Sequence, residues 1–184
     1  MFQTMKRVLL TSLLCVATCV ASAAEPDSTQ PVSAAQAFVT KATQDGLAEI
    51  MLGQTVEKRT KDPKVKEFAT QMVADHTKAN AELAAIAKRK NLEVPTDLDD
   101  KHATMVHSVS TKPPSEFDGE YAKKMREAHD NAVTLFTDAS AVGDKEIAAF
   151  AKKTLPTLKQ HQQMAAMLPG KPAASTSEEP SAEP

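Results

Sequence analysis

Two histidines in this chain stand where helical spacing predicts a buried core. Both belong to the pattern aromatic-x3-Met-x3-His, which occurs as Phe68-Met72-His76 and as Tyr121-Met125-His129. Steps of three and four residues place side chains on one face of an α-helix, and the other positions on this face are apolar. His76 and His129 therefore interrupt two stripes that otherwise read as core.

A third histidine and a carboxylate occupy similar places in two further helical stretches. His161 lies eleven residues after Phe150, and Glu49 lies eleven residues after Phe38. The four polar residues of this kind are Glu49, His76, His129 and His161. Each falls near the middle of an expected helix, so we expect them to meet at one level of a helical bundle. Three imidazoles and a carboxylate at one point are suitable ligands for a transition metal such as copper, zinc or iron.

Three neighbouring side chains extend this candidate site. They are Asp45, Met72 and Met125, each one helical turn before a member of the set. Thioether ligands would shift the preference toward Cu(I). The same residues also have a purely structural interpretation: inward His and Glu side chains hydrogen-bond one another and define helix register, and methionines fill the core. The sequence leaves both interpretations open.

Familiar catalytic motifs do not coincide with these residues. Di-iron carboxylate enzymes built on a four-helix bundle use Glu-x-x-His on two helices, and no Glu-x-x-His occurs in the chain. Asp75 and Glu127 lie close to two of the histidines in sequence, but helical geometry turns them away from the site. There is no nucleophile arrangement, and a net charge of −2 gives no electrostatic case for nucleic acid. We therefore expect no catalytic turnover.

Four long helices must position the candidate site. Apolar periodicity, capping residues and prolines predict helices over 34–60, 63–90, 115–141 and 145–168. The first and last connections are short, whereas the middle one contains a short helix over about 97–110 and is long enough to travel the length of a bundle. This connectivity predicts an all-α, ferritin-like four-helix bundle whose second and third long helices run parallel.

Local features of these helices lead to further expectations. Gly46 and Gly53 lie in the first helix, and their low helix propensity favours close approach by a neighbouring helix. Pro156 lies inside the last helix and is expected to kink it. The short helix is expected to begin after a Thr96 cap. We expect His102, on this helix, to be exposed to solvent.

The chain outside the helices predicts export. Lys6 and Arg7 precede an apolar run and a stretch of small residues, which is typical of a secretory signal peptide over 1–24. Both cysteines, Cys15 and Cys19, lie in this segment, so the mature chain has no disulfide. The residues before Cys19 fit a lipid-anchor motif poorly.

The remaining segments complete the predicted organisation. Residues 25–33 read as a polar linker, residues 34–168 as the bundle domain and residues 169–184 as a disordered tail. We expect a periplasmic protein without a transmembrane domain in its mature chain. An envelope protein or a second copy of the chain is a candidate partner.

A set of local motifs extends over most of the predicted bundle. It comprises Ala37-Phe38-Val39, Gly46-Leu47-Ala48-Glu49, Asp75-His76-Thr77-Lys78-Ala79-Asn80, Tyr121-x-x-x-Met125-x-x-x-His129 and Leu155-Pro156-x-Leu158-Lys159-x-His161. Together these resemble the DUF4142 family of secreted bacterial proteins, which are often labelled outer-membrane proteins. The resemblance covers roughly residues 37–168 and implies a ferritin-like bundle in the periplasm or envelope, without an established activity. The family usually has Asp before the histidine of the third helix, where this chain has Ala128.

Three functions are consistent with these observations. We predict a non-catalytic periplasmic bundle protein with a binding or stress-related role. The main alternative is a metal-binding or redox protein that uses the His and Glu residues of the core. A third possibility is an envelope interaction module that acts through its surface and acidic tail.

Overall fold

The computed structural model describes residues 33–141 and 143–169. These residues form five α-helices and no strand: α1 (Ala34–Arg59), α2 (Pro63–Arg89), α3 (Asp100–Ser110), α4 (Pro114–Ala141) and α5 (Lys145–Met167). The ends of the four long helices agree with the predicted ends to within one residue. The predicted signal peptide with both cysteines, residues 25–32 of the predicted linker and the predicted tail from residue 170 lie outside the described residues.

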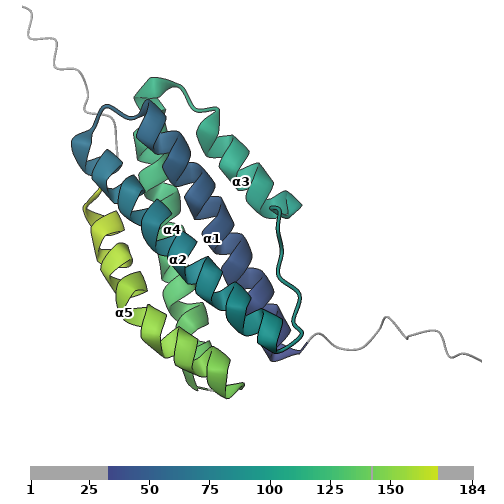
Figure 1. Ribbon diagram of the computed structural model, residues 1–184. Coiled ribbons are helices and arrows are strands. Elements are labelled where there is room, and N and C mark those ends of the chain that lie inside the picture. Colours follow the sequence, from purple (N-terminus) through teal and green to yellow (C-terminus); the bar gives the residue numbers. More distant parts are fainter. Residues whose placement is uncertain (1–32, 142, 170–184) are drawn as a thin grey trace, which may run out of the picture. The chain divides into compact units, whose positions relative to one another are not determined.

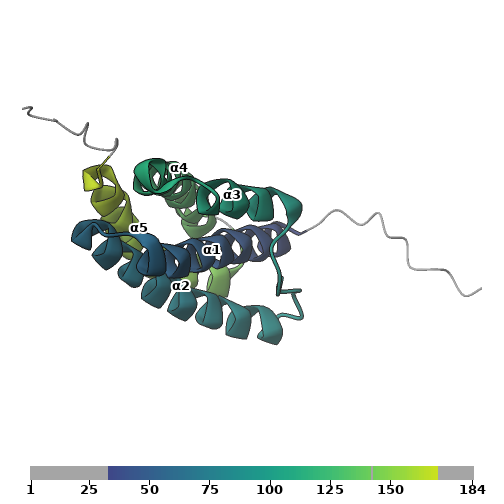
Figure 2. The ribbon, with the colours of Figure 1, turned by 90° about the horizontal axis from the view of Figure 1, so that it is seen from above.

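The four long helices form two antiparallel hairpins, α1–α2 and α4–α5, which pack into a bundle (Figure 1). The segment that joins the hairpins runs back along the bundle and includes α3, so α2 and α4 point in the same direction. Viewed from above, α3 lies outside the bundle beside α1 and α4 (Figure 2). The predicted fold class, an all-α bundle with ferritin-like connectivity, is confirmed.

Capping side chains determine where most helices begin. Ser33, Asp62 and Asp144 each accept hydrogen bonds from backbone N–H groups in the first turn of α1, α2 and α5. These N–H groups have no partner within the helix, so a capping oxygen stabilises each start by about 1 kcal/mol.

The short helix α3 begins later than predicted. The expected start was near residue 97 after a Thr96 cap, but the Asp99 side chain accepts from the backbone N–H of His102 and α3 starts at Asp100. The same Asp99 carboxylate also contacts the His102 ring. These two interactions favour Asp99 over Thr96 as the cap.

Close contact between α1 and α2 explains the two glycines of α1. A Cβ atom on Gly53 would lie 2.6 Å from the Val73 side chain and 3.0 Å from the carbonyl oxygen of Ala69. A Cβ atom on Gly46 would overlap the side-chain amide of Asn80. The predicted close approach of a neighbouring helix is therefore confirmed.

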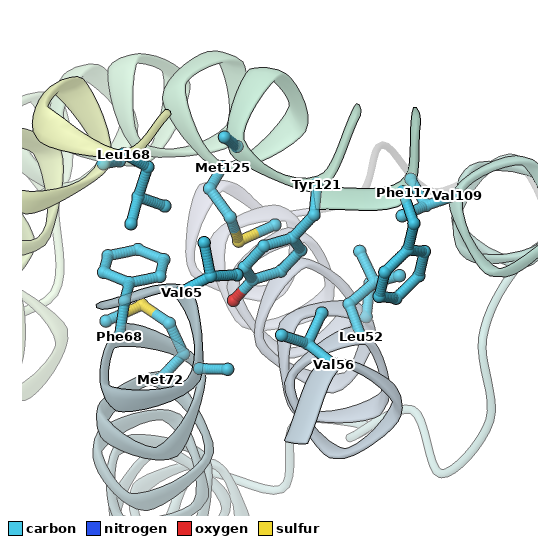
Figure 3. Close-up of a cluster of buried hydrophobic side chains, with 14 of the residues drawn as sticks. Leu52, Val56, Val65, Phe68, Met72, Val109, Phe117, Tyr121, Met125 and Leu168 are labelled. Carbon is cyan, nitrogen blue, oxygen red and sulfur yellow. The ribbon is translucent and has the colours of Figure 1, made fainter. Parts of the chain in front are cut away.

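The bundle core consists of two apolar clusters. The Tyr121 cluster contains Leu52, Val56, Phe68, Met72, Phe117, Tyr121, Met125, Leu168 and smaller neighbours (Figure 3). The Phe136 cluster contains Phe38, Val39, Leu83, Ile86, Phe136, Ile147, Phe150, Leu158 and smaller neighbours. On α2, α4 and α5 a single buried histidine separates residues of one cluster from residues of the other, and on α1 the buried Glu49 lies between Ala48 and Leu52 of the Tyr121 cluster. A polar layer therefore divides the core into two apolar halves.

In the described part of the chain, no helix is both long enough and apolar enough to span a bilayer.

Candidate metal centre

Each long helix contributes one residue to the polar layer. The four are Glu49 from α1, His76 from α2, His129 from α4 and His161 from α5, all buried. One nitrogen atom from each histidine lies within 4.8 Å of the corresponding nitrogens of the other two. The structure therefore brings together the four residues that the sequence placed at one level.

Glu49 carries the negative charge of the layer. Its Oε2 atom lies 2.7 Å from Nε2 of His76, and its Oε1 atom lies 3.8 Å from Nδ1 of His129. Burial alone would raise the pKa of Glu49, but His76, followed by His129, lowers this pKa to about 2. Burial likewise opposes protonation of His76, but the Glu49 carboxylate raises the pKa of the imidazole overall. In the metal-free protein these two residues therefore form a buried ion pair.

The contact between these two residues is short but poorly aligned. Neither Oε2 of Glu49 nor Nε2 of His76 has a hydrogen-bond partner of acceptable angle. The two groups therefore attract each other by charge while their hydrogen-bonding capacity stays unused.

His129 is held in a single tautomer by its own helix. Its Nδ1 atom lies 2.9 Å from the carbonyl oxygen of Met125. A carbonyl oxygen can only accept, so Nδ1 carries the proton and donates it. The lone pair of the neutral ring is then on Nε2, which is buried and has no partner. A backbone carbonyl that fixes the tautomer in this way is typical of imidazoles that bind metals.

His161 has the opposite tautomer. Its Nε2 atom lies 2.9 Å from Oδ2 of Asp75, to which it donates, and its Nδ1 atom is buried without a partner. Burial, and then the neighbouring His76 and His129, lower the pKa of His161 to about 4. The ring is therefore neutral at pH 7, with its lone pair on Nδ1.

Asp75 contacts the polar layer, and the sequence prediction missed this contact. Its position in α2 was expected to turn it away from the site, and this expectation is wrong. Asp75 lies where α5 packs against α2, and its Oδ2 atom accepts a hydrogen bond from Nε2 of His161 there. Helical periodicity describes a residue relative to its own helix, so it could not identify this contact. Asp75 does belong to the motif Asp75-His76-Thr77-Lys78-Ala79-Asn80, but the motif assigns it no contact.

Buried polar atoms without a hydrogen-bond partner show whether the polar layer could hold a metal ion. Seven buried side-chain polar atoms lack a hydrogen-bond partner among the described residues, and four of them are Glu49 Oε2, His76 Nε2, His129 Nε2 and His161 Nδ1. Leaving such an atom unpaired costs about 1–3 kcal/mol. All four are electron-pair donors once the rings are neutral, and borderline transition metals prefer imidazole nitrogen with a carboxylate oxygen. The three histidines lie close enough to one another to hold a transition-metal ion, and Glu49 adjoins them at His76.

The three additional candidates lie outside this donor set. The Asp45 carboxylate is 2.9 Å from Nε2 of His102 and 3.1 Å from Nζ of Lys41. Met72 and Met125 are buried in the Tyr121 cluster, where their sulfur atoms lie beside the rings of Phe68 and Tyr121 (Figure 3). Their position is that of core residues.

The expectation of a solvated His102 is wrong. The residue is 9% exposed, and its two ring nitrogens contact Asp99 at 2.7 Å and Asp45 at 2.9 Å. Asp45 is on α1, so His102 fastens the short helix to the bundle. This partner is 57 residues away in sequence, and the pattern of an eleven-residue helix gave no signal for it.

Comparisons with known proteins bear on family and fold. A family model described as "Domain of unknown function (DUF4142)" matches residues 20–168. The crystal structure of a DUF305 fragment from Deinococcus radiodurans is similar, with a TM-score of 0.64 and 16% sequence identity. The match covers 74% of this chain and 96% of that chain, and at this identity it shows the fold alone. Among curated proteins, none matches the chain.

Proposed function

This chain belongs to the DUF4142 family, a domain of unknown function, and we propose that it binds one transition-metal ion in the core of its bundle. The ligands are His76, His129, His161 and Glu49. The observation that carries the proposal is the set of four buried donor atoms, one from each long helix, that have no hydrogen-bond partner.

The second sphere of contacts supports this assignment. The Met125 carbonyl and the Asp75 carboxylate accept hydrogen bonds from the ring nitrogens of His129 and His161 that are not directed to the site. Such contacts orient metal-binding imidazoles and increase their basicity. Glu49 Oε2 and His76 Nε2 face each other at 2.7 Å, but a purely structural layer would also be expected to give His129 Nε2 and His161 Nδ1 a hydrogen-bond partner, and both have none.

The donor set limits which metals are suitable. Three imidazoles and a carboxylate favour Zn²⁺, Cu²⁺ or Fe²⁺ over Mg²⁺ or Ca²⁺, which prefer all-oxygen sites. With both methionines in the apolar core, thioether ligation has no support, and the case for Cu(I) is weaker than the sequence suggested.

The cellular setting is proposed from the sequence. The signal-peptide pattern over residues 1–24 supports a periplasmic location, where the protein would bind or buffer a metal rather than turn over a substrate. Binding to an envelope partner or to a second copy of the chain stays a prediction.

The proposal is tested by measuring metal content and affinity without an affinity tag. We expect the purified or reconstituted protein to hold about one equivalent of metal, and a His76→Ala/His161→Ala variant to lose it. His107→Ala is the matched control, because His107 is an exposed histidine of α3 outside the layer. Wild-type protein that binds no metal, or a double variant that binds as well as His107→Ala, would leave the layer with a structural role only.

A further inference from the structure

A small cavity adjoins the polar layer on one side. It has a volume of about 30 Å³, and three of the four layer residues, Glu49, His76 and His161, line it. The rest of its wall includes Ala132 and Phe136 of α4. The other side of the layer is closed by the Tyr121 cluster. An ion in the layer would therefore be approachable from the cavity side alone.

The cavity also lies next to a surface groove between α2 and α5. Asp75, Ala79, Thr154 and Thr157 line both the cavity and the groove. Two of these side chains are threonines and one is alanine, so this wall is thin. Lys153, which is 65% exposed and pairs with Glu82 at 2.7 Å, lies in the outer groove. These shared side chains are therefore what separates the cavity from the outer groove between the two helices.

From this arrangement we propose that the cavity binds a small exogenous ligand, an anion or neutral molecule of two or three heavy atoms, directly on the metal. The inference rests on the proposed function, because the ligand needs an ion in the layer. A water molecule needs a cavity volume of about 10–15 Å³, so a cavity of about 30 Å³ accommodates about two waters or one ligand of two or three heavy atoms. Larger molecules exceed this volume.

The chemistry of the site favours a small anion over a neutral ligand. A divalent ion and one carboxylate leave a net positive charge in a buried site, where charges interact more strongly than in water. Three imidazoles and one carboxylate oxygen do not fill the tetragonal coordination that Cu²⁺ adopts, and the cavity is where a fifth ligand fits. Azide, a linear anion of three heavy atoms, is therefore a suitable probe.

The experiment uses the Cu²⁺-loaded full chain, after its metal content has been measured. Titration with azide is expected to produce a new charge-transfer absorption band that saturates at one azide per copper. Ala132→Val should weaken azide binding by roughly tenfold or more, because added methyl groups overfill the cavity. Ala139→Val is the matched control, since Ala139 lies two turns further along α4 and does not line the cavity. It should bind azide like the wild type.

A second measurement does not depend on any variant. Imidazole, with five heavy atoms, should not perturb the copper spectrum at concentrations where azide saturates it. The inference is overturned if copper-loaded protein shows no azide band, if imidazole binds as readily, or if Ala132→Val and Ala139→Val behave alike. A protein that takes up no metal at all would instead refute the proposed function, so the two failures are distinguishable.

Discussion

Replacing Glu49 by Gln tests whether the layer contains a buried ion pair in the metal-free protein. The change keeps the shape of the side chain but leaves His76 without its negative partner at 2.7 Å. The pKa of Glu49 falls from 4.5 to about 2 on folding, which corresponds to roughly 3 kcal/mol in favour of the ionised form. Loss of one partner of a buried pair typically costs about 3–5 kcal/mol. We therefore expect Glu49→Gln to lower the free energy of unfolding by about 3 kcal/mol at pH 6.

The pH dependence of this loss gives a sharper test. A carboxyl group with a lowered pKa in the folded state stabilises the protein above pH 4.5, and this contribution disappears as the pH falls toward 2. His76 has a raised pKa, so its contribution is complete below pH 6.5 and disappears as the pH rises through the folded value. The difference between wild type and variant should be largest between pH 4.5 and 6.5.

The assay is urea denaturation followed by circular dichroism, with a chelator present throughout. Glu57→Gln is the control, because Glu57 is on the same helix but hydrogen-bonds only at the surface, to Thr70. We expect this control to change stability by less than about 0.5 kcal/mol. A Glu49→Gln variant that is as stable as the control, or a stability difference that does not vary with pH, would refute the ion pair.

Three other perturbations have expected outcomes. Gly53→Ala should destabilise the protein by about 1–3 kcal/mol in urea denaturation, because its methyl group would meet the stiff Val73 side chain and the Ala69 carbonyl oxygen. At Gly46 the same change meets the movable side-chain amide of Asn80 and should be better tolerated. Equal effects at the two glycines would contradict this packing. Asp75→Asn should lower metal affinity by about 10–100-fold in calorimetric titration with little change in helix content, because His161 loses its orienting carboxylate; unchanged affinity would show that the contact is incidental. His102→Ala should accelerate amide hydrogen exchange in α3 while metal stoichiometry stays at the wild-type value, because the ring fastens α3 to α1; a loss of metal would link α3 to the site.

Most of the fold could be predicted because its signals are local. Apolar positions repeat at helical spacing, and Ser33, Asp62 and Asp144 mark three of the helix starts within one turn of where they act. The length of the middle connection then determined that α2 and α4 run parallel. With directions known, counting residues from each helix centre was enough to place the four polar residues at one height.

The features that could not be predicted depend on how each helix packs against the neighbouring helices. Asp75 and His102 both meet partners on another element, and the periodicity of a single helix carries no information about that partner. The tautomers of His129 and His161 are set by a carbonyl oxygen and by Asp75, so they too required coordinates. The cavity beside the layer is space that the side chains of the packed helices leave unfilled. The spacing of residues along the sequence carries no information about such unfilled space.

The polar layer straddles the two hairpins described above. Glu49 and His76 belong to the first hairpin, whereas His129 and His161 belong to the second, and the helices make far more contact within each hairpin than between them. An ion held by all four residues would therefore add a direct link between two halves that are otherwise joined by the two apolar clusters and one crossover. If a protease nicked the crossover, the severed halves would separate less readily with the ion bound than after a chelator had removed it.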